Sequence, residues 1–384
     1  MTLTASSALD RIQSILPAIR ERASQADRQG QLPTEDLDAL RQSGYLTSSV
    51  PQDYGGWGLS LRDAVAAHLE LAQGSGSTAL VAGMQVQMLG NMGETDRHAQ
   101  VYPQFCRWAV EDAALINTAA SEPVMGSPSH GAFYATHAVE KDGGWLINGH
   151  KTWTTGGKHL THILVKLKIG DDKAILLVKQ DTPGMEWVET WGSALSFRAS
   201  ESNDLLFKDV WVADDQLIER VEPEDRLPNA WYALIMAATY LGVAIGARDD
   251  LIRYSFERVP TSLGKPIATL PKIQRQIGEI DIQLQMAQTY LLSVAESWQG
   301  SGEQKLAQWP RIMAAKVQAI ETANRVTEQA LRTAGGPSIT TDLPLERHFR
   351  DVRAGLMQPP SSEAALESNG RAAIDRIAPL DDIA

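Results

Sequence analysis

Hydrophobic residues recur at intervals of three and four along the first third of the chain, a period typical of amphipathic helices. The first such stripe consists of Leu9, Ile12, Ile15, Leu16 and Ile19. Pro33-Thr34 opens a second helical segment, residues 61–73 predict a third, and a longer one begins near Ser77. The glycine-rich stretch PQDYGGWG, residues 51–58, interrupts them. We therefore expect a helical N-terminal domain over residues 1–114.

The spacing changes after residue 114, where short runs rich in Val, Ile, Thr and Trp are separated by glycine-containing turns. The predicted strands cover residues 134–139, 145–147, 152–155, 163–169, 174–179 and 205–211. Turn signals between them are Asp142-Gly143-Gly144, Asn148-Gly149 and Gly170-Asp171-Asp172. This pattern predicts a central antiparallel domain, of barrel or sandwich type, over residues 115–227.

Helical spacing returns after residue 227. Three long helices are predicted at 231–256, 266–291 and 305–333, and Gly335-Gly336 follows the last of them, as a helix C-cap would. Gly242 and Gly246 share one face of the first helix, where a neighbouring helix can approach closely. We expect a C-terminal four-helix bundle over residues 228–384, and an α+β fold with helices, strands and helices in that order.

Composition narrows the function classes. The 384 residues carry a formal charge of −12 and no block of Lys or Arg, which argues against a nucleic-acid binder. Cys106 is the single cysteine, so we expect no intramolecular disulfide and a small buried apolar residue there. His68, His98, His137 and His159 lack partners at metal-ligand spacing, and no metal site is predicted. Without a secretion signal or an apolar run long enough to span a membrane, the expected location is cytoplasmic.

The segment WLINGHKTWTTGG, residues 145–157, holds the most distinctive candidate chemistry. Asn148-Gly149 predicts a two-residue hairpin turn. On the strand that follows, alternation would place Lys151, Trp153 and Thr155 on one face. An indole flanked by hydroxyls and followed by two glycines suits a planar heteroaromatic ligand. The alternative is that Trp153 is ordinary core and the threonines are strand formers.

Five motifs, in order, resemble those of the acyl-CoA dehydrogenase family of flavoproteins, and the resemblance covers nearly the whole chain. Toward the N-terminus they are PQDYGGWG at 51–58 and SEPVMGS at 121–127. The central ones are WLINGHKTWTT at 145–155 and RASES at 198–202, which precedes LFKDV at 206–210. The fifth is the glycine pair at 335–336 with PLERHFRD at 344–351. Each motif alone is weakly specific, but five in this order form a specific signal.

The resemblance implies an FAD held between the central domain and the C-terminal bundle. By this match the flavin contacts are Ser121, Trp153, Thr154 and Thr155, and Ser127 faces the substrate. An acyl-CoA or another small-molecule substrate would occupy the remaining space. FAD rather than FMN rests on the resemblance alone.

Other motif residues imply an oligomer, because family members bind part of the FAD across a subunit interface. Gly335 and Gly336 would let backbone approach the dinucleotide, and Arg258 would pair with its pyrophosphate. The family usually has R-x-x-F-G where this chain reads RVPTSLG, and a glutamine where Arg332 stands. We expect a homodimer or homotetramer whose contacts to the dinucleotide differ from those usual in the family.

The catalytic base of the family dehydrogenases is missing from its usual place. They supply a glutamate in a Y-E-G-T motif, whereas this chain reads MQPPSSE and places Pro359 at that position. Proline offers neither a side-chain base nor a backbone N–H. Some members place the base at a second location, early in the first C-terminal helix. That location falls near Tyr232 and offers no carboxylate. The candidate base is therefore Glu363, four residues beyond Pro359; further carboxylates without motif support are Glu222, Glu224 and Asp225.

Two reactions follow from these motifs. The first is α,β-desaturation of an acyl thioester, in which a base takes the α-proton, hydride passes to flavin N5, and an electron-transfer flavoprotein reoxidises the cofactor. The alternative is a two-component monooxygenase, in which reduced flavin from a flavin reductase meets oxygen and no α-proton base is needed. The KTWTTGG segment and the diproline resemble the sequences of that branch. A flavoprotein with only a binding role is a third reading.

Overall fold

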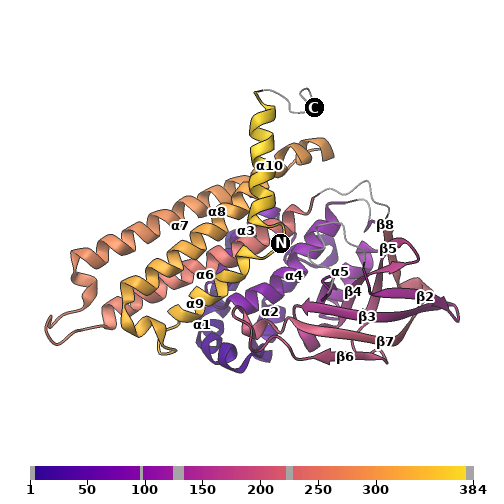
Figure 1. Cartoon of the computed structure of the whole chain (residues 1–384), viewed down its shortest axis with the longest axis horizontal. Coiled ribbons are helices and arrows are strands. Elements are labelled where there is room, and N and C mark those ends of the chain that lie inside the picture. The colour runs from indigo at the N-terminus through magenta and orange to yellow at the C-terminus, as the bar shows by residue number, and fades with distance from the viewer. Residues whose placement is uncertain (1–4, 96–97, 124–133, 222–227, 378–384) are drawn as a thin grey trace.

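The computed structural model describes residues 5–95, 98–123, 134–221 and 228–377, and it confirms the predicted order of helices, strands and helices (Figure 1). Side-chain caps begin two of the N-terminal helices: the Ser60 hydroxyl accepts a hydrogen bond from the Asp63 N–H, and Ser75 does the same for Thr78. The N-terminal helices are α1 (Ala5–Gln29), α2 (Thr34–Ser43), α3 (Leu61–Ala72), α4 (Gly76–Gly93) and α5 (Tyr102–Val110).

The central region forms one eight-stranded sheet, in which neighbouring strands are mostly antiparallel. Its order is β6-β7-β3-β2-β4-β5-β8, and β1 pairs in parallel with β4. Three short strands, β1, β6 and β8, were not predicted from the sequence. The strands are β1 (Ile116–Ala119), β2 (His137–Lys141), β3 (Gly144–Thr154), β4 (His162–Ile169), β5 (Asp172–Lys179), β6 (Met185–Val188), β7 (Asn203–Ala213) and β8 (Leu217–Val221).

The hairpin predicted at Asn148-Gly149 is wrong, because both residues lie inside the continuous strand β3. The turn between β2 and β3 is Asp142-Gly143, with φ values of 53° and 72° that a type I′ turn requires. Asn148 instead faces a bulge in β7, where its side-chain oxygen accepts from the Asp209 backbone N–H at 2.9 Å. The asparagine therefore satisfies an irregular backbone on the neighbouring strand instead of making a turn.

Three long helices, α6 (Ala230–Glu257), α7 (Pro271–Ser297) and α8 (Gly302–Ala334), run side by side in the C-terminal region (Figure 1). Shorter helices α9 (Leu345–Asp351) and α10 (Ser362–Asp375) follow. On length and composition α6 would pass as a membrane span, contrary to our expectation from the sequence. However, 94% of its most apolar stretch is buried inside the protein, as in a core helix.

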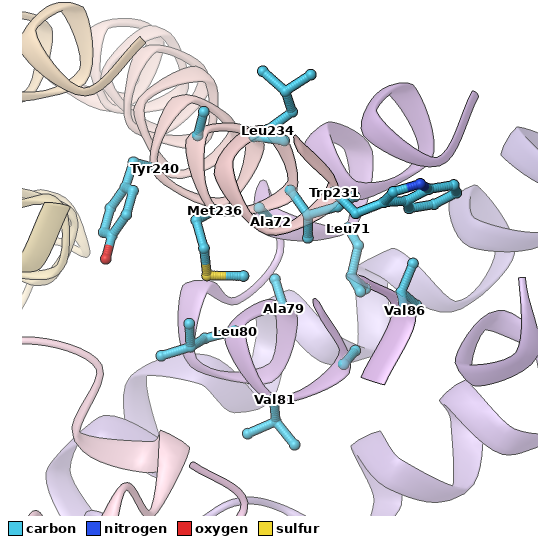
Figure 2. Packing of buried hydrophobic residues seen from close by; sticks show 14 of the residues in the cluster. Leu71, Ala72, Ala79, Leu80, Val81, Val86, Trp231, Leu234, Met236 and Tyr240 are labelled. Atoms are coloured by element: carbon cyan, nitrogen blue, oxygen red, sulfur yellow. The ribbon is translucent and has the colours of Figure 1, made fainter. Parts of the chain in front are cut away.

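Helix α6 lies at the centre of the core because α3 and α4 from the N-terminal region pack on it as well as α7 and α8. Figure 2 shows Met236 of α6 directed at Ala79 and Leu80 of α4. A buried polar link crosses the α3–α6 contact, where the His68 imidazole bonds to the Tyr45 hydroxyl at 2.6 Å and to the Thr239 hydroxyl at 2.8 Å. Burial lowers the pKa of His68 to about 3, so the imidazole is neutral and serves packing.

Two glycines in long helices are expected to respond to alanine with opposite signs. A Cβ on Gly242 would lie 2.6 Å from the Ala72 Cβ and 2.6 Å from the Leu69 carbonyl oxygen, so Gly242→Ala should destabilise the protein by roughly 1–3 kcal/mol. Gly278 in α7 has no atom within 4 Å of that position. Gly278→Ala should therefore stabilise by about 0.5–1 kcal/mol. Thermal unfolding midpoints test both, and shifts of the same sign would contradict the packing argument.

Candidate functional site

A cavity of about 1500 Å³ opens between the central sheet, α4, the start of α6 and the segment after α9. Its walls come from regions far apart in the sequence: α4, β3, α6 and residues 353–359 all contribute. Of the predicted flavin contacts, Ser121, Trp153 and Thr155 line this cavity. Pro359 and Tyr232, the two positions where family dehydrogenases place a base, line it too. The fold therefore brings the two halves of the predicted site together.

Trp153 reaches the cavity through an irregularity in β3. The β3–β7 register shifts between Lys151 and Thr154, so two residues of β3 oppose one of β7, and Trp153 adopts a left-handed φ of 57°. As a result Lys151 is fully buried while the Trp153 indole is 63% exposed. The prediction that both side chains project from the same face is wrong, because the bulge breaks the alternation. An exposed indole in a strained backbone conformation points to a ligand-contact role.

Several residues with hydroxyl side chains line the cavity together with Trp153. The Thr155 hydroxyl pairs with that of Ser202 at 2.9 Å, and the Ser121 carbonyl accepts from the Thr152 N–H at 2.9 Å. The Thr152 hydroxyl is buried on the cavity wall and finds no partner among the described residues. Thr154 is also buried with an unpartnered hydroxyl in the described part of the chain, but it does not line the cavity. The Thr152 hydroxyl is thus an unpredicted candidate for bonding a ring edge.

A buried ion pair fixes the loop that carries Ser121 to β3. Lys151 Nζ lies 2.6 Å from Glu122 Oε1, and both side chains are at most 1% exposed. Glu122 also accepts from the backbone N–H groups of Ala135 and Thr136. Burial would raise the pKa of Glu122, but hydrogen bonds from Lys151 and Thr136 outweigh it and hold the pKa below its usual value. Burial lowers the pKa of Lys151 to about 8, so both groups are charged near neutral pH.

The part of the cavity wall formed by Tyr232, Tyr240 and Gln358 carries a chain of hydrogen bonds. The Tyr240 hydroxyl donates to Gln358 Oε1, and Gln358 Nε2 donates to the Tyr232 hydroxyl at 3.0 Å. Burial raises the pKa of both tyrosines, so both hydroxyls keep their protons. All three side chains line the cavity beside Pro359. Where family dehydrogenases carry a carboxylate, this chain therefore presents neutral donors.

Lys316, on the buried face of α8, holds this wall in place. It is 1% exposed, and its Nζ donates to the carbonyl oxygens of Gln358 at 2.6 Å and Pro360 at 2.5 Å. Among the described residues no carboxylate pairs with it, and burial lowers the pKa of Lys316 to about 7. The side chain thus fixes the backbone on both sides of Pro359.

This low pKa predicts a pH-dependent effect of Lys316→Met. Because the folded-state pKa is about 7 and the ordinary value is 10.5, the unfolded chain binds more protons between these values. At low pH the native protein is weakened because the Lys316 ammonium is charged and buried. As the pH rises through about 7, the group loses its proton and this cost disappears. From about pH 6 to about pH 9, the thermal midpoint of the wild type should rise relative to Lys316→Met. The exposed Lys272→Met variant should show a constant difference, and a constant difference for Lys316→Met would contradict the prediction.

The carboxylates on the cavity wall are already paired. Glu94 accepts from the Trp298 indole N–H at 3.0 Å and from Lys305 at 3.3 Å. Glu219 lies 3.2 Å from the His98 imidazole, and Glu122 is bound to Lys151. Within the described ranges, no cavity-lining carboxylate is left unpaired. No group of three or more His, Cys, Asp or Glu side chains in that part of the chain is arranged to hold a metal ion.

Other predicted site residues lie elsewhere. Arg258, Gly335 and Gly336 are exposed at the far ends of α6 and α8, and none lines the cavity. The 28 residues of α6 separate Arg258 from the cavity end of that helix by roughly 40 Å. Glu363 lies in the first turn of α10, exposed and outside the cavity wall. That placement gives no support to Glu363 as a base, although its role stays a prediction.

Four predicted residues fall outside the described residues: Ser127, Glu222, Glu224 and Asp225. Conversely, sequence reasoning missed Gln358, Lys316 and an apolar stripe on α4. The stripe consists of Leu80, Met84, Met88 and Met92, and its regular spacing of four was a usable signal. A second usable signal was Lys316, a lysine that lies among apolar residues of α8 such as Met313 and Ala319.

Comparison with known proteins gives a consistent result. Models of the acyl-CoA dehydrogenase N-terminal, middle and C-terminal domains match residues 15–107, 117–210 and 234–357. A putative acyl-CoA dehydrogenase of Bacillus subtilis (strain 168), YdbM, is 34% identical over 361 residues, which cover 93% of this chain and 94% of that protein.

Solved structures extend the similarity. KijD3, in complex with FMN and dTDP-3-amino-2,3,6-trideoxy-4-keto-3-methyl-D-glucose, has a TM-score of 0.83 at 27% identity, covering 97% of this chain and 94% of that chain. Two more distant structures share the fold. Dibenzothiophene monooxygenase (TdsC) of Paenibacillus sp. A11-2 has a TM-score of 0.80 at 22% identity, covering 96% and 97% of the two chains. Butyryl-CoA dehydrogenase of Megasphaera elsdenii has a TM-score of 0.81 at 23% identity, covering 97% and 99%.

Proposed function

We propose that this chain, which belongs to the acyl-CoA dehydrogenase family of flavin-dependent enzymes, is a monooxygenase that uses reduced flavin and oxygen. The observation that carries the proposal is the part of the cavity wall that holds Tyr232 and Pro359. Both positions where family dehydrogenases place a base carry residues that cannot serve, Pro359 and a protonated Tyr232. The carboxylates nearby are engaged in ion pairs or hydrogen bonds. Oxygenation does not require an α-proton base, so this wall is compatible with it.

The residues around Trp153 fit a flavin. The exposed indole offers a stacking surface, and the unpartnered Thr152 hydroxyl offers a hydrogen bond to a ring edge. Ser121 and Thr155 lie on the same wall. A bound flavin would supply the two electrons that activate oxygen. The protein's own contribution is to hold the ring, exclude water and orient the substrate, and a flavin reductase would be the redox partner.

The remaining predicted cofactor residues fit a second copy of the chain. Arg258, Gly335 and Gly336 lie roughly a helix length from the cavity, too far to reach a flavin bound there by the same protomer. If the cofactor is FAD, these residues would contact the adenosine half of a partner's dinucleotide in a homodimer or homotetramer. If it is FMN, they have no such role. Separate titrations with FAD and FMN distinguish the two.

Desaturation of an acyl thioester is the second candidate, and the 34% identity to a putative acyl-CoA dehydrogenase favours it. It needs a base at the cavity. Glu363 would have to move from the exposed first turn of α10 to provide one. Electron-transfer flavoprotein would then be the redox partner.

One experiment separates the candidates. The flavin-loaded protein is mixed anaerobically with acyl-CoA thioesters of different chain lengths, and the flavin absorbance is followed. We expect no bleaching with any thioester, and product only when reduced flavin and oxygen are supplied. Bleaching by a thioester would overturn the monooxygenase. In that case Glu363→Gln should abolish the bleaching if Glu363 is the base.

A further inference from the structure

The hydrogen bonds among Tyr240, Gln358 and Tyr232 on the cavity wall have a direction. Tyr240 donates to the Gln358 side-chain oxygen, which leaves the Gln358 amide N–H groups to donate to the Tyr232 oxygen. The hydroxyl hydrogen of Tyr232 is then available. Within the described ranges the Tyr232 hydroxyl donates to no protein atom, and its side chain is partly exposed at the cavity. Among the described residues the Tyr232 hydroxyl is thus a donor without an acceptor, on a side chain that lines the cavity.

The position of this donor matters because the neighbouring backbone cannot replace it. Pro359 lines the same wall and has no N–H. Lys316 fixes the carbonyl oxygens on either side of Pro359, so the Gln358 side chain is held at a defined place between the two tyrosines. The Tyr232 hydroxyl is therefore a preorganised donor, and no rearrangement is needed for it to meet an acceptor.

Helix α4 and the sheet contribute apolar side chains to the cavity wall. Leu80, Met84, Met88 and Met92 are spaced by four along α4 and all line the cavity. Residues at that spacing form one stripe along a helix. Thioether side chains are flexible and polarisable, and they pack well against aromatic rings of varied shape. Leu164, Ile175 and Ile218 from the sheet add to this surface.

The carboxylates on the cavity wall are paired. The carboxylates of Glu94, Glu122 and Glu219 each have a positively charged or imidazole partner. Arg353, on the same wall, donates to Asn324 at 2.5 Å and stacks over the Phe349 ring. A cationic ligand would have to compete with the partners of these carboxylates, and a neutral one would not.

We propose that the cavity binds a neutral, largely apolar, ring-containing substrate with one acceptor oxygen, which the Tyr232 hydroxyl holds. The inference names the substrate class of the proposed monooxygenase and rests on that proposal for the flavin's place on the Trp153 side. Tyr232 is a binding residue in this scheme, and Gln358 and Tyr240 are positioning residues that direct its hydroxyl.

The test compares two probes of similar shape on the flavin-loaded protein: acetophenone, which has an acceptor oxygen, and ethylbenzene, which has none. Dissociation constants are measured by calorimetry for the wild type and Tyr232→Phe. We expect Tyr232→Phe to weaken acetophenone about tenfold, the change that one neutral hydrogen bond produces, and to change ethylbenzene less than twofold. Infrared spectroscopy should show the acetophenone carbonyl stretch shifted to lower frequency in the wild type and not in Tyr232→Phe.

A second variant tests the direction of the network without removing an aromatic hydroxyl. In Gln358→Glu the carboxylate accepts only, so it should draw the Tyr232 hydroxyl hydrogen away from the cavity and weaken acetophenone selectively. Tyr290→Phe, a tyrosine of α7 outside the cavity, is the matched control and should leave both constants unchanged.

Equal losses for both probes, an unshifted carbonyl band, or no binding of either probe to the wild type would each overturn the inference. These binding outcomes do not depend on oxygen chemistry. Thioester bleaching would remove the monooxygenase while leaving the probe measurements interpretable, so the two failures are distinguishable.

Discussion

Replacing Lys151 with Met should destabilise the protein more than any other single change considered, by about 3–5 kcal/mol. The ammonium group is fully buried against Glu122, so its removal leaves an uncompensated carboxylate inside the protein. The entropy of unfolding scales with chain length, so this loss corresponds to a fall of roughly 4–6 °C in the thermal midpoint. The loop that carries Ser121 should loosen as well, because Glu122 anchors it to β3.

Two variants control this result. Lys208→Met removes a lysine from the exposed pair with Glu186 and should cost at most about 1 kcal/mol. Adding Glu122→Gln to Lys151→Met removes both charges and should recover part of the lost stability, because the amide oxygen still accepts from one of the two backbone N–H groups of Ala135 and Thr136. If the double variant is no more stable than Lys151→Met, the unpaired charge is not the cause.

Trp153→Ala should weaken flavin binding by about thirtyfold, equivalent to about 2 kcal/mol of lost stacking area. Trp153 is 63% exposed and lines the cavity, and a methyl group cannot stack on a ring. Fluorescence titration of the flavin-free protein with FAD, and separately with FMN, measures the dissociation constant. Trp153→Phe should lose less than Trp153→Ala, because it keeps an aromatic face.

The matched control is Trp211→Ala, which removes an exposed tryptophan from β7 outside the cavity and should leave flavin affinity unchanged. Trp153→Gly adds a backbone test. Glycine accommodates the left-handed φ of 57°, so this variant should lose flavin affinity without losing stability. An unchanged dissociation constant for both Trp153→Ala and Trp153→Gly would remove the indole from the flavin site.

The element order was predictable from the sequence because helical spacing and strand alternation are local signals. The prediction for Asn148-Gly149 was wrong because an asparagine side chain can satisfy a bulge on a neighbouring strand as well as a turn, and only strand pairing decides between them. The same limit applies to Trp153, whose direction depends on the bulge opposite Asp204. Register across a sheet is not encoded in one strand alone.

The candidate site was predictable in part. Motif resemblance selected Ser121, Trp153 and Thr155, which the fold gathers on one wall. Gln358 could not be selected in that way, because its importance comes from two tyrosines more than a hundred residues away along the chain. Roles that depend on such distant contacts require the tertiary structure.

The central position of α6 has a consequence for how the chain is made. His68 of α3 bonds to Thr239 of α6 across 171 residues, and Gly242 lies against the backbone of Leu69. During synthesis the first helices emerge from the ribosome long before their partner exists, and the sheet must be built in between. A fragment that stops before α6 would expose the apolar faces of α3 and α4 to water. The N-terminal region is thus expected to reach its native packing only when the whole polypeptide has been made.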